Sequence, residues 1–429
     1  MLRPSYCSLF SVFTLEYSVM NRLLFSGFAA AAIIGSFFVW GGRTIEVDYS
    51  PSASLNNSSL PPRPDGDLPY QSPLPNPPAA VRALYVTNWV AGTPSLLSSV
   101  IAARGDSINA LIIDIKDFSG YVGFNSDTEL VNTYHSRELR IKHLNSLIRD
   151  LHEKGFYLIG RLTVFQDPLL AAARPDLAVK TATGQVWRDR HGLSWVDPAS
   201  PEVWEYNAAL SKEIIARGFD EVNFDYIRFP TDGANISSLV YPVWNKEEAK
   251  YEVVRRFFAY MRNELPDAVL SADLFGQTTV APDDIGIGQR LEDAYDYFNY
   301  LSPMVYPSHF ANGAFGFTNP AAHPYDIIKL SLTAAVAKLE AHESALAAAA
   351  LATTTPQTIS PAAKSRLRAK LRPWLQDFDL GAVYTVDMVK SEIQAVRDAG
   401  LSDSWLIWNP SNKYRPAIFT SSTSQPPSP

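Results

Sequence analysis

The sequence predicts an α/β protein built as a closed barrel of eight parallel strands, a (β/α)8 TIM barrel, and three observations support this. From Val81 onward, short runs of β-type residues alternate with amphipathic helical segments, which is the pattern of parallel βαβ units. The number of these units, eight, favours a closed ring over an open sheet. The turn after the first run, Thr87-Asn88-Trp89, also lacks the glycine-rich phosphate loop of an open doubly wound sheet.

Each barrel element follows from local patterning. The predicted strands are Ala83–Asn88, Ala110–Lys116, Tyr157–Val164, Glu221–Ile227, Val269–Leu274, Leu301–Tyr306, Arg372–Phe378 and Trp405–Asn409. Apolar residues at helical spacing lie between them, for example Leu144, Leu147, Ile148 and Leu151, or Ala249, Val253, Phe257 and Tyr260. The barrel is therefore predicted to cover residues 81–415, and residues 416–429 are predicted to form a disordered tail.

The chain before the barrel is predicted to include a membrane segment. Residues 23–40 are apolar or small, are flanked by Arg22 and Arg43, and are just long enough to span a bilayer. We expect a signal anchor with residues 1–22 in the cytoplasm and the barrel outside. A cleaved signal peptide, which would leave the barrel secreted, is the alternative, and Met20 is an alternative start. Residues 41–80, rich in Pro, Ser and Asn, are predicted to be a disordered linker.

Composition limits the classes of partner. The formal net charge is -7, from 37 Lys and Arg against 44 Asp and Glu, and no extended basic run suggests a nucleic-acid surface. Cys7 is the single cysteine, and the seven histidines form no His-x-His or His-Glu-x-x-His motif. We therefore expect that the protein binds no metal, cofactor or nucleic acid. Contact with a membrane is expected through the N-terminal segment described above.

Two aspartates at the ends of adjacent predicted strands are the candidate catalytic pair. On the fourth strand, alternation points Val222 and Phe224 toward the helices and leaves Asn223 and Asp225 facing the barrel interior. Asp273 ends the fifth strand with the same inward parity. Because active sites of such barrels lie at the carboxyl ends of the strands, the two carboxyl groups are expected to converge. One ionised and one protonated carboxyl group is what glycoside hydrolysis requires.

Other strand ends supply polar and aromatic groups of the kind that bind sugars. Arg228 is the expected partner that keeps Asp225 ionised, although a salt bridge between them that only closes the loop is an alternative. Asp114 and Lys116 share one parity, so they either bind substrate or form a structural ion pair. The candidate substrate-binding residues are Asp114, Lys116, Asp117, Arg161, Asn223, Arg228, Tyr306, His309, Trp374, Gln376, Trp408 and Asn409.

Four segments carry a resemblance to a bacterial family of uncharacterised glycosyl hydrolase domains, which are TIM barrels similar to α-amylases. These segments are DEVNFDYIRFP at 220–230, IDIKD at 113–117, RPWLQDF at 372–378 and LIWNP at 406–410. The resemblance implies a nucleophile after strand four and an acid after strand five, which correspond to Asp225 and Asp273. The chain departs from the α-amylase pattern by having Asp rather than Glu on strand five, and Gln376 where a third carboxylate would point inward.

The sequence therefore predicts a glycoside hydrolase or transglycosylase that acts on an envelope or extracellular polysaccharide. A catalytically inactive barrel that binds glycan and organises the cell envelope is the main alternative. A spacing of roughly 5 to 9.5 Å between the carboxyl groups of the pair would favour the enzyme. A metal-dependent hydrolase is disfavoured by the spacing of the histidines.

Overall fold

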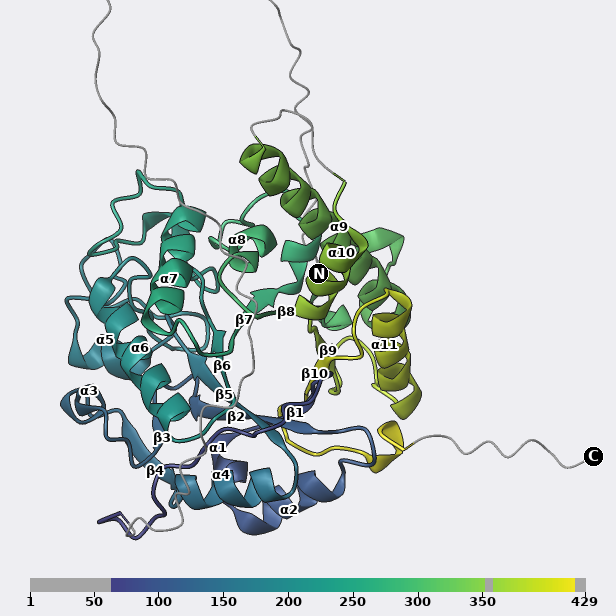
Figure 1. The fold of residues 1–429 in the computed structure, drawn as a ribbon. Coiled ribbons are helices and arrows are strands. Elements are labelled where there is room, and N and C mark those ends of the chain that lie inside the picture. The colour runs from purple at the N-terminus through teal and green to yellow at the C-terminus, as the bar shows by residue number, and fades with distance from the viewer. Residues whose placement is uncertain (1–62, 352–357, 421–429) are drawn as a thin grey trace, which may run out of the picture. The chain divides into compact units, whose positions relative to one another are not determined.

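A closed parallel barrel forms the part of the chain that the computed structural model describes, residues 63–351 and 358–420 (Figure 1). The ring follows the order β1, β2, β5, β6, β7, β8, β9, β10, and it closes because β1 pairs with both β10 and β2. The ring strands are β1 (Arg82–Val86), β2 (Ala110–Lys116), β5 (Tyr157–Thr163), β6 (Glu221–Asp225), β7 (Leu270–Phe275), β8 (Tyr300–Met304), β9 (Trp374–Gln376) and β10 (Trp405–Trp408). The predicted barrel is confirmed, and each end of each strand lies within two residues of its predicted position.

An insertion follows β2 and adds two short strands outside the ring. β3 (Val122–Phe124) pairs antiparallel with β2, and β4 (Arg137–Ile141) pairs with β3. Because this insertion connects the carboxyl end of β2 to the next helix, it belongs to the face of the barrel on which active sites form. We call this face, at the carboxyl ends of the ring strands, the mouth.

Helices separate the ring strands and cover the outside of the barrel (Figure 1). They are α1 (Asn88–Ala91), α2 (Pro94–Ala102), α3 (Glu129–Thr133), α4 (Leu144–Glu153), α5 (Pro168–Ala173), α6 (Pro201–Ala216), α7 (Lys250–Glu264), α8 (Leu291–Tyr295), α9 (Pro324–Ala350), α10 (Pro361–Lys370) and α11 (Val386–Asp398). The eight-fold repeat is incomplete in one place. Up to residue 420, β10 is followed by a 3-10 turn at Pro416–Ile418 in place of an α-helix.

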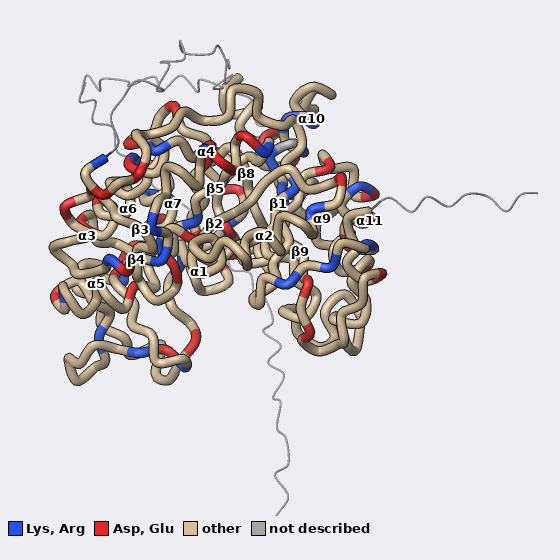
Figure 2. The backbone as a smooth tube through the Cα atoms, turned by 90° about the horizontal axis from the view of Figure 1, so that it is seen from below, with Lys and Arg blue, Asp and Glu red and all other residues tan. Residues whose placement is uncertain are grey.

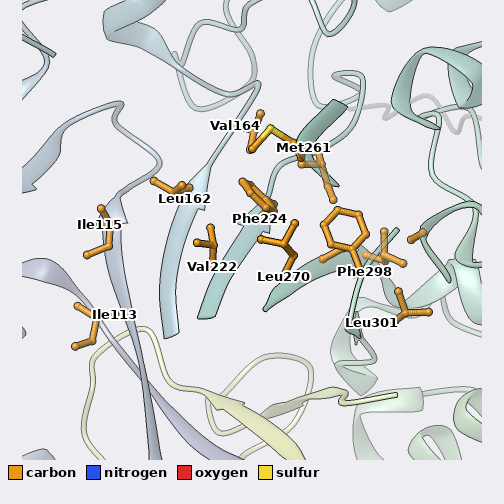
Figure 3. Close-up of a cluster of buried hydrophobic side chains, with 14 of the residues drawn as sticks. Ile113, Ile115, Leu162, Val164, Val222, Phe224, Met261, Leu270, Phe298 and Leu301 are labelled. Atoms are coloured by element: carbon orange, nitrogen blue, oxygen red, sulfur yellow. The ribbon is translucent and has the colours of Figure 1, made fainter. Parts of the chain in front are cut away.

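Strand alternation divides the buried residues into two groups. Val222, Phe224 and Leu270 point outward and pack with helix residues such as Met261 in the core between strands and helices (Figure 3). Tyr157, by contrast, belongs to a smaller apolar cluster inside the barrel. The polar residues on the inward parity of β6 and β7 share this interior. Because side chains alternate along a strand, burying the apolar residues in the outer core points their neighbours on the strand into the barrel.

The folded unit begins and ends outside the predicted limits of residues 81 and 415. The Asp67 carboxylate accepts hydrogen bonds from the Asn145 and Ser146 amides at 2.8 and 3.0 Å, at the first turn of α4. At the other end, the Phe419 ring stacks on Trp405 with 6.3 Å between centroids. Asp67 and Phe419 therefore contact the barrel, because residues outside the barrel strands and helices still gain free energy by capping and covering an existing scaffold.

The remaining N-terminal predictions concern residues that lie outside the described part of the chain. These are the cytoplasmic segment 1–22, the membrane segment 23–40 and the linker up to residue 62. From residue 63 to 351 and from 358 to 420, no helix combines the length and apolar character needed to cross a bilayer. Basic and acidic residues are interspersed along the described chain, without a region of one sign (Figure 2).

Candidate active site

Arg161, on β5, lies at the centre of three aspartates near the carboxyl ends of β2, β6 and β7. Its Nη1 donates to Asp114 Oδ1 at 2.6 Å, its Nη2 donates to Asp225 Oδ2, and its Nε lies 3.7 Å from Asp273 Oδ2. The side chains of Arg161 and Asp225 are 12% and 10% exposed, whereas those of Asp114 and Asp273 are 3% and 1% exposed. We call these four residues the carboxylate cluster; Asp225 is its most accessible carboxylate and Asp273 its most buried one.

The carboxylate cluster brings together the two residues that alternation placed on inward parity. Contact with a single guanidinium keeps the carboxyl groups of Asp225 and Asp273 within about 10 Å of each other, the range over which glycosidase carboxyl pairs cooperate. Three potential negative charges surround one positive charge. Since burying an excess of like charge is costly, at least one of these carboxyl groups is expected to hold a proton.

Asp273 is the member whose surroundings favour the protonated form most strongly, and burial also raises the pKa of Asp114. Its Oδ1 accepts hydrogen bonds from Asn223 Nδ2 at 2.8 Å and from Trp374 Nε1 at 2.7 Å. Its Oδ2 is buried and has no hydrogen-bond partner within the described residues. Burial, followed by the nearby negative charge of Asp225, raises the pKa of Asp273 to about 8, although Arg161 opposes the shift. Oδ2 is therefore the oxygen that would carry the proton, because two donors occupy Oδ1.

Asp225 is held in a different way, by one donor on each oxygen. The Tyr226 backbone amide donates to Asp225 Oδ1 at 2.6 Å, while Arg161 donates to Oδ2. Tyr226 itself has a φ of 54°, in the left-handed region that a tyrosine rarely adopts. Such strain persists only where the surrounding structure imposes it, and it is often found at functional sites. Here it turns the chain immediately after β6 and points the amide at the carboxylate.

Arg228 is not the partner of Asp225, so both the predicted pairing and the loop-closing salt bridge are wrong. Its Nη2 donates to Asp232 Oδ2 at 2.8 Å, and its guanidinium lies 4.8 Å from the centroid of the Trp195 ring. The physical reason is the left-handed turn at Tyr226, which ends strand alternation before Arg228. The cation beside Asp225 comes from the neighbouring strand instead.

Lys116 points away from the barrel interior, and this overturns both predictions made for it. Its Nζ donates to Asp167 Oδ2 at 2.8 Å, both side chains are 0% exposed, and the ammonium lies 4.8 Å from the centroid of the Tyr206 ring on α6. An irregularity in the pairing of β2 with β5 lies between Asp114 and Lys116. Because one extra residue changes the side of the strand that a residue faces, Asp114 stays inside while Lys116 turns outward.

Asp117 belongs to a separate polar group at the rim of the mouth. Its Oδ2 accepts a hydrogen bond from Arg140 Nη1, and its Oδ1 accepts one from the Ser119 amide at 2.9 Å. Arg140 comes from β4 and also donates to Asn88 Oδ1 at 2.9 Å. The structure therefore places Asp117 with the insertion after β2, and no hydrogen bond or ion pair joins its side chain to the carboxylate cluster in the described residues.

Four rings form an aromatic group at the ends of β8, β9 and β10. Tyr306 lies 5.2 Å from His309, 5.8 Å from Phe378 and 5.3 Å from Trp408, measured between ring centroids. Trp408 and Phe378 are partly exposed, so this group offers apolar ring surface near the carboxylate cluster. Trp374, which was predicted to bind sugar, is 2% exposed and instead orients Asp273.

Gln376 and Asn409 stabilise the loops of the mouth. Gln376 Oε1 accepts a hydrogen bond from Ser308 Oγ at 2.8 Å, and Asn409 Nδ2 donates to the Asp377 carbonyl at 2.7 Å. Both side chains are buried, at 0% and 8% exposure, so these groups are already used by the protein.

Tyr85 is a member of the site that sequence reasoning missed. Its hydroxyl donates to Asp114 Oδ2 at 2.5 Å, which fixes the carboxylate that in turn holds Arg161. Burial, followed by the charge of Asp114, raises the pKa of the Tyr85 hydroxyl well above its ordinary value. The sequence did contain a signal for this role, because the tyrosine hydroxyl is a polar group on a first strand that is otherwise apolar after Arg82. Among the described residues, no group of three or more His, Cys, Asp or Glu side chains could hold a metal ion.

Residues 83–414 match the family described as "Putative glycosyl hydrolase domain", and the chain belongs to this family. No curated protein matches the chain. A crystal structure of a hypothetical protein from Ruminiclostridium thermocellum is 37% identical over 48% of this chain and 98% of its own, with a TM-score of 0.41.

Two glycoside hydrolase structures are also similar to this chain. An α-galactosidase from Thermus thermophilus, in complex with p-nitrophenyl α-D-galactopyranoside, is 13% identical over 82% of this chain and 61% of its own, with a TM-score of 0.47. The glycoside hydrolase domain of PelA from Pseudomonas aeruginosa is 11% identical over 79% of this chain and 97% of its own, with a TM-score of 0.39.

Proposed function

We propose that the barrel cleaves glycosidic bonds of an envelope or extracellular polysaccharide, as a hydrolase or transglycosylase, and that Asp225 and Asp273 are its catalytic carboxyl groups. The observation that carries the proposal is the contrast between two carboxyl groups that contact one guanidinium. Asp225 receives hydrogen bonds from a cation and an amide, while Asp273 leaves one buried oxygen without a donor. Two carboxyl groups whose environments push their protonation apart are the basis of acid and base assignments in glycosidases.

The proposed chemistry assigns one role to each group. Asp225 carries the negative charge and either attacks the anomeric carbon or stabilises the positive charge that develops there. Asp273 donates the proton on Oδ2 to the oxygen of the departing sugar, which prevents the leaving group from departing as an alkoxide. Arg161 holds the two carboxyl groups in place, and it neutralises the charge left on Asp273 after the proton has gone.

Neutral amide substitutions test this assignment. In Asp225→Asn and Asp273→Asn, shape is retained while the charge or the transferable proton is lost, so turnover on a cleaved polysaccharide should fall by several orders of magnitude. The matched control is Asp232→Asn, which removes a half-exposed carboxylate from the loop after β6 and should leave turnover unchanged. Wild-type turnover in either of the first two variants would remove that residue from the mechanism.

One observation favours the alternative of an inactive, glycan-binding barrel. The Asp273 side chain is 1% exposed and lies against Arg161, so a sugar oxygen reaches Oδ2 only if the arginine side chain moves. In an inactive barrel, the wild-type protein would cleave no polysaccharide, and Asp225→Asn would change only glycan affinity, by about 1–3 kcal/mol through a lost charge-assisted hydrogen bond. Turnover measured on the wild type decides between the two functions.

The place of action is part of the same proposal. We infer from the apolar segment at residues 23–40 that the barrel is tethered on the outer side of a membrane, or secreted after cleavage. Fractionation of cells that express the full chain should place it in the membrane or medium, and deletion of residues 1–40 should leave it in the cytosol. Recovery of the full chain in the cytosol would contradict this location.

A further inference from the structure

Only two aromatic side chains of the described residues, Trp89 and Phe118, are more than half exposed, and both lie at the mouth. Trp89 is 55% exposed and Phe118 is 53% exposed. Trp89 lies in α1, directly after β1, and Phe118 lies two residues after the end of β2. Because β1 and β2 are neighbours in the ring, the two rings project from adjacent loops on the active face.

Trp89 is supported from one side. The Arg140 guanidinium lies 4.7 Å from the centroid of the indole, and Arg140 is anchored in turn by Asn88 and Asp117. The backbone below it is tightly packed, since a Cβ added at Gly92 would lie 2.0 Å from the Arg140 carbonyl oxygen. The insertion after β2 thus braces the indole, whose surface is nevertheless more than half open to solvent.

The loop that carries Phe118 is also fixed. Gln166 Nε2 donates to the Phe118 carbonyl at 3.1 Å. A Cβ added at Gly120 would lie 2.4 Å from Asp167 Oδ1, so the loop approaches the start of α5 more closely than any other residue would allow. Two braced, exposed rings cost solubility without adding to the core, which points to a ligand for them.

The polar groups beside the two rings have different roles. Arg140 connects Trp89 to Asp117, which immediately precedes Phe118, but the side chains of Arg140 and Asp117 are only 5% and 9% exposed, so they hold the two loops in place. The exposed polar group is the Glu138 carboxylate, which accepts a hydrogen bond from Arg140 Nε at 3.1 Å and is 37% exposed. Apolar ring faces beside a carboxylate are matched by pyranose rings, which present C–H faces and hydroxyl edges.

The position of this surface suits a ligand of more than one sugar. In the ring order, β1 lies across the mouth from β7, which carries Asp273, whereas β2 carries Asp114 of the carboxylate cluster itself. A glycan that contacts both Asp273 and Trp89 therefore crosses the mouth, while Phe118 follows the strand that carries Asp114.

We propose that Trp89 and Phe118 form a distal sugar-binding surface that holds pyranose units of a polymeric glycan beyond the unit at the cleaved bond. The inference rests on the proposed function, since it extends the substrate from a glycoside to a long chain. The surface binds by stacking and needs no catalysis, so it is tested separately from turnover.

The experiment is affinity electrophoresis in native gels that contain galactomannan or glycol chitin, two soluble pyranose polymers. The parent protein is the full chain with Asp225→Asn, a substitution that prevents cleavage during the run. Trp89→Ala and Phe118→Ala are introduced singly into this parent. Leu346→Ala is the matched control, because Leu346 is 46% exposed and lies near the carboxyl end of α9, the end that leads away from the mouth.

We expect at least one polymer to retard the parent, and each aromatic substitution to weaken the apparent affinity about fivefold or more, while Leu346→Ala has no effect. Equal retardation of the parent and the Trp89→Ala variant would overturn the proposal, as would no retardation by either polymer. If binding depends on Trp89 but the wild type never cleaves glycan, only the proposed function is contradicted. If the wild type cleaves a polymer and Trp89→Ala binds it unchanged, only the proposal of the distal surface is contradicted.

Discussion

The barrel interior contains two ionic groups that differ in how well their charges are matched. Near the amino ends of the strands, Glu221 and Arg372 form a pair in which both side chains are 0% exposed. Glu221 Oε2 also accepts from the Tyr157 hydroxyl at 3.2 Å, and Oε1 accepts from Ser271 Oγ at 2.5 Å. Near the carboxyl ends, the carboxylate cluster sets three carboxyl groups against Arg161 alone.

This difference separates a structural role from a chemical one. The lower pair, Glu221 and Arg372, balances one charge with one charge and supplies donors to both oxygens of Glu221. Arg372 Nε, which is buried, is its one atom without a hydrogen-bond partner in the described residues. The cluster at the mouth keeps an excess of carboxyl groups and leaves Asp273 Oδ2 without a donor. Such an arrangement reduces stability, and proteins retain it where the groups must exchange protons or bind something else.

The largest expected effect comes from breaking the lower pair. Arg372→Met leaves Glu221 buried without its cation and should lower the free energy of unfolding by about 3–5 kcal/mol in urea denaturation. Adding Glu221→Gln to this variant removes the stranded charge and should restore part of the loss. If Arg372→Met alone is as stable as wild type, the lower pair does not have the structural role assigned to it.

The second prediction uses pH to distinguish the mouth from the lower pair. The pKa of Asp273 is raised to about 8, so its contribution to stability is complete below the ordinary pKa of about 4 and is lost as the pH rises through 8. Wild-type stability should therefore fall between pH 4 and 8, by up to about 1.4 kcal/mol per pH unit, and this contribution should vanish in Asp273→Asn. Unfolding is measured at each pH, and Asp232→Asn should keep the wild-type slope.

The third prediction concerns the hydrogen bond that orients Asp273. Trp374→Phe removes the Nε1 donor to Oδ1, a bond that favours the ionised form, so the pKa of Asp273 should rise further, by about one unit. Carbon-13 NMR titration of the aspartate carboxyl groups measures the shift without a substrate. Trp408→Phe, which removes an indole with no hydrogen bond to Asp273, is the control. An unchanged titration in Trp374→Phe would show that the indole only fills space.

The smallest expected effect lies outside both ionic groups. Asp67→Ala removes the carboxylate that accepts from the first turn of α4 and should cost about 0.5–2 kcal/mol of stability. Asp67→Asn retains an acceptor and should cost less. Neither variant should change the Asp273 titration, since the segment lies outside the barrel interior. A shift in that titration would mean that the N-terminal segment influences the site.

The wrong predictions for Arg228 and Lys116 share a cause. Arg228 was expected beside Asp225 because it is close in sequence, but the left-handed Tyr226 ends the strand pattern between them. Lys116 was expected inside because it shares parity with Asp114, but the irregularity in β2 turns it outward. Each error follows from one residue at which the backbone leaves regular strand geometry.

The sequence by itself determined the eight strands, the closed ring and the inward direction of Asp225 and Asp273. These features depend on alternation with a period of two and on helical spacing, which are properties of short segments. Only the tertiary structure decided that Arg161 is the shared cation, that Trp374 and Asn223 occupy one oxygen of Asp273, and that the other oxygen is left to hold a proton. Those outcomes depend on which side chains meet across closed strands and on how completely they are buried, and neither quantity is local in the chain.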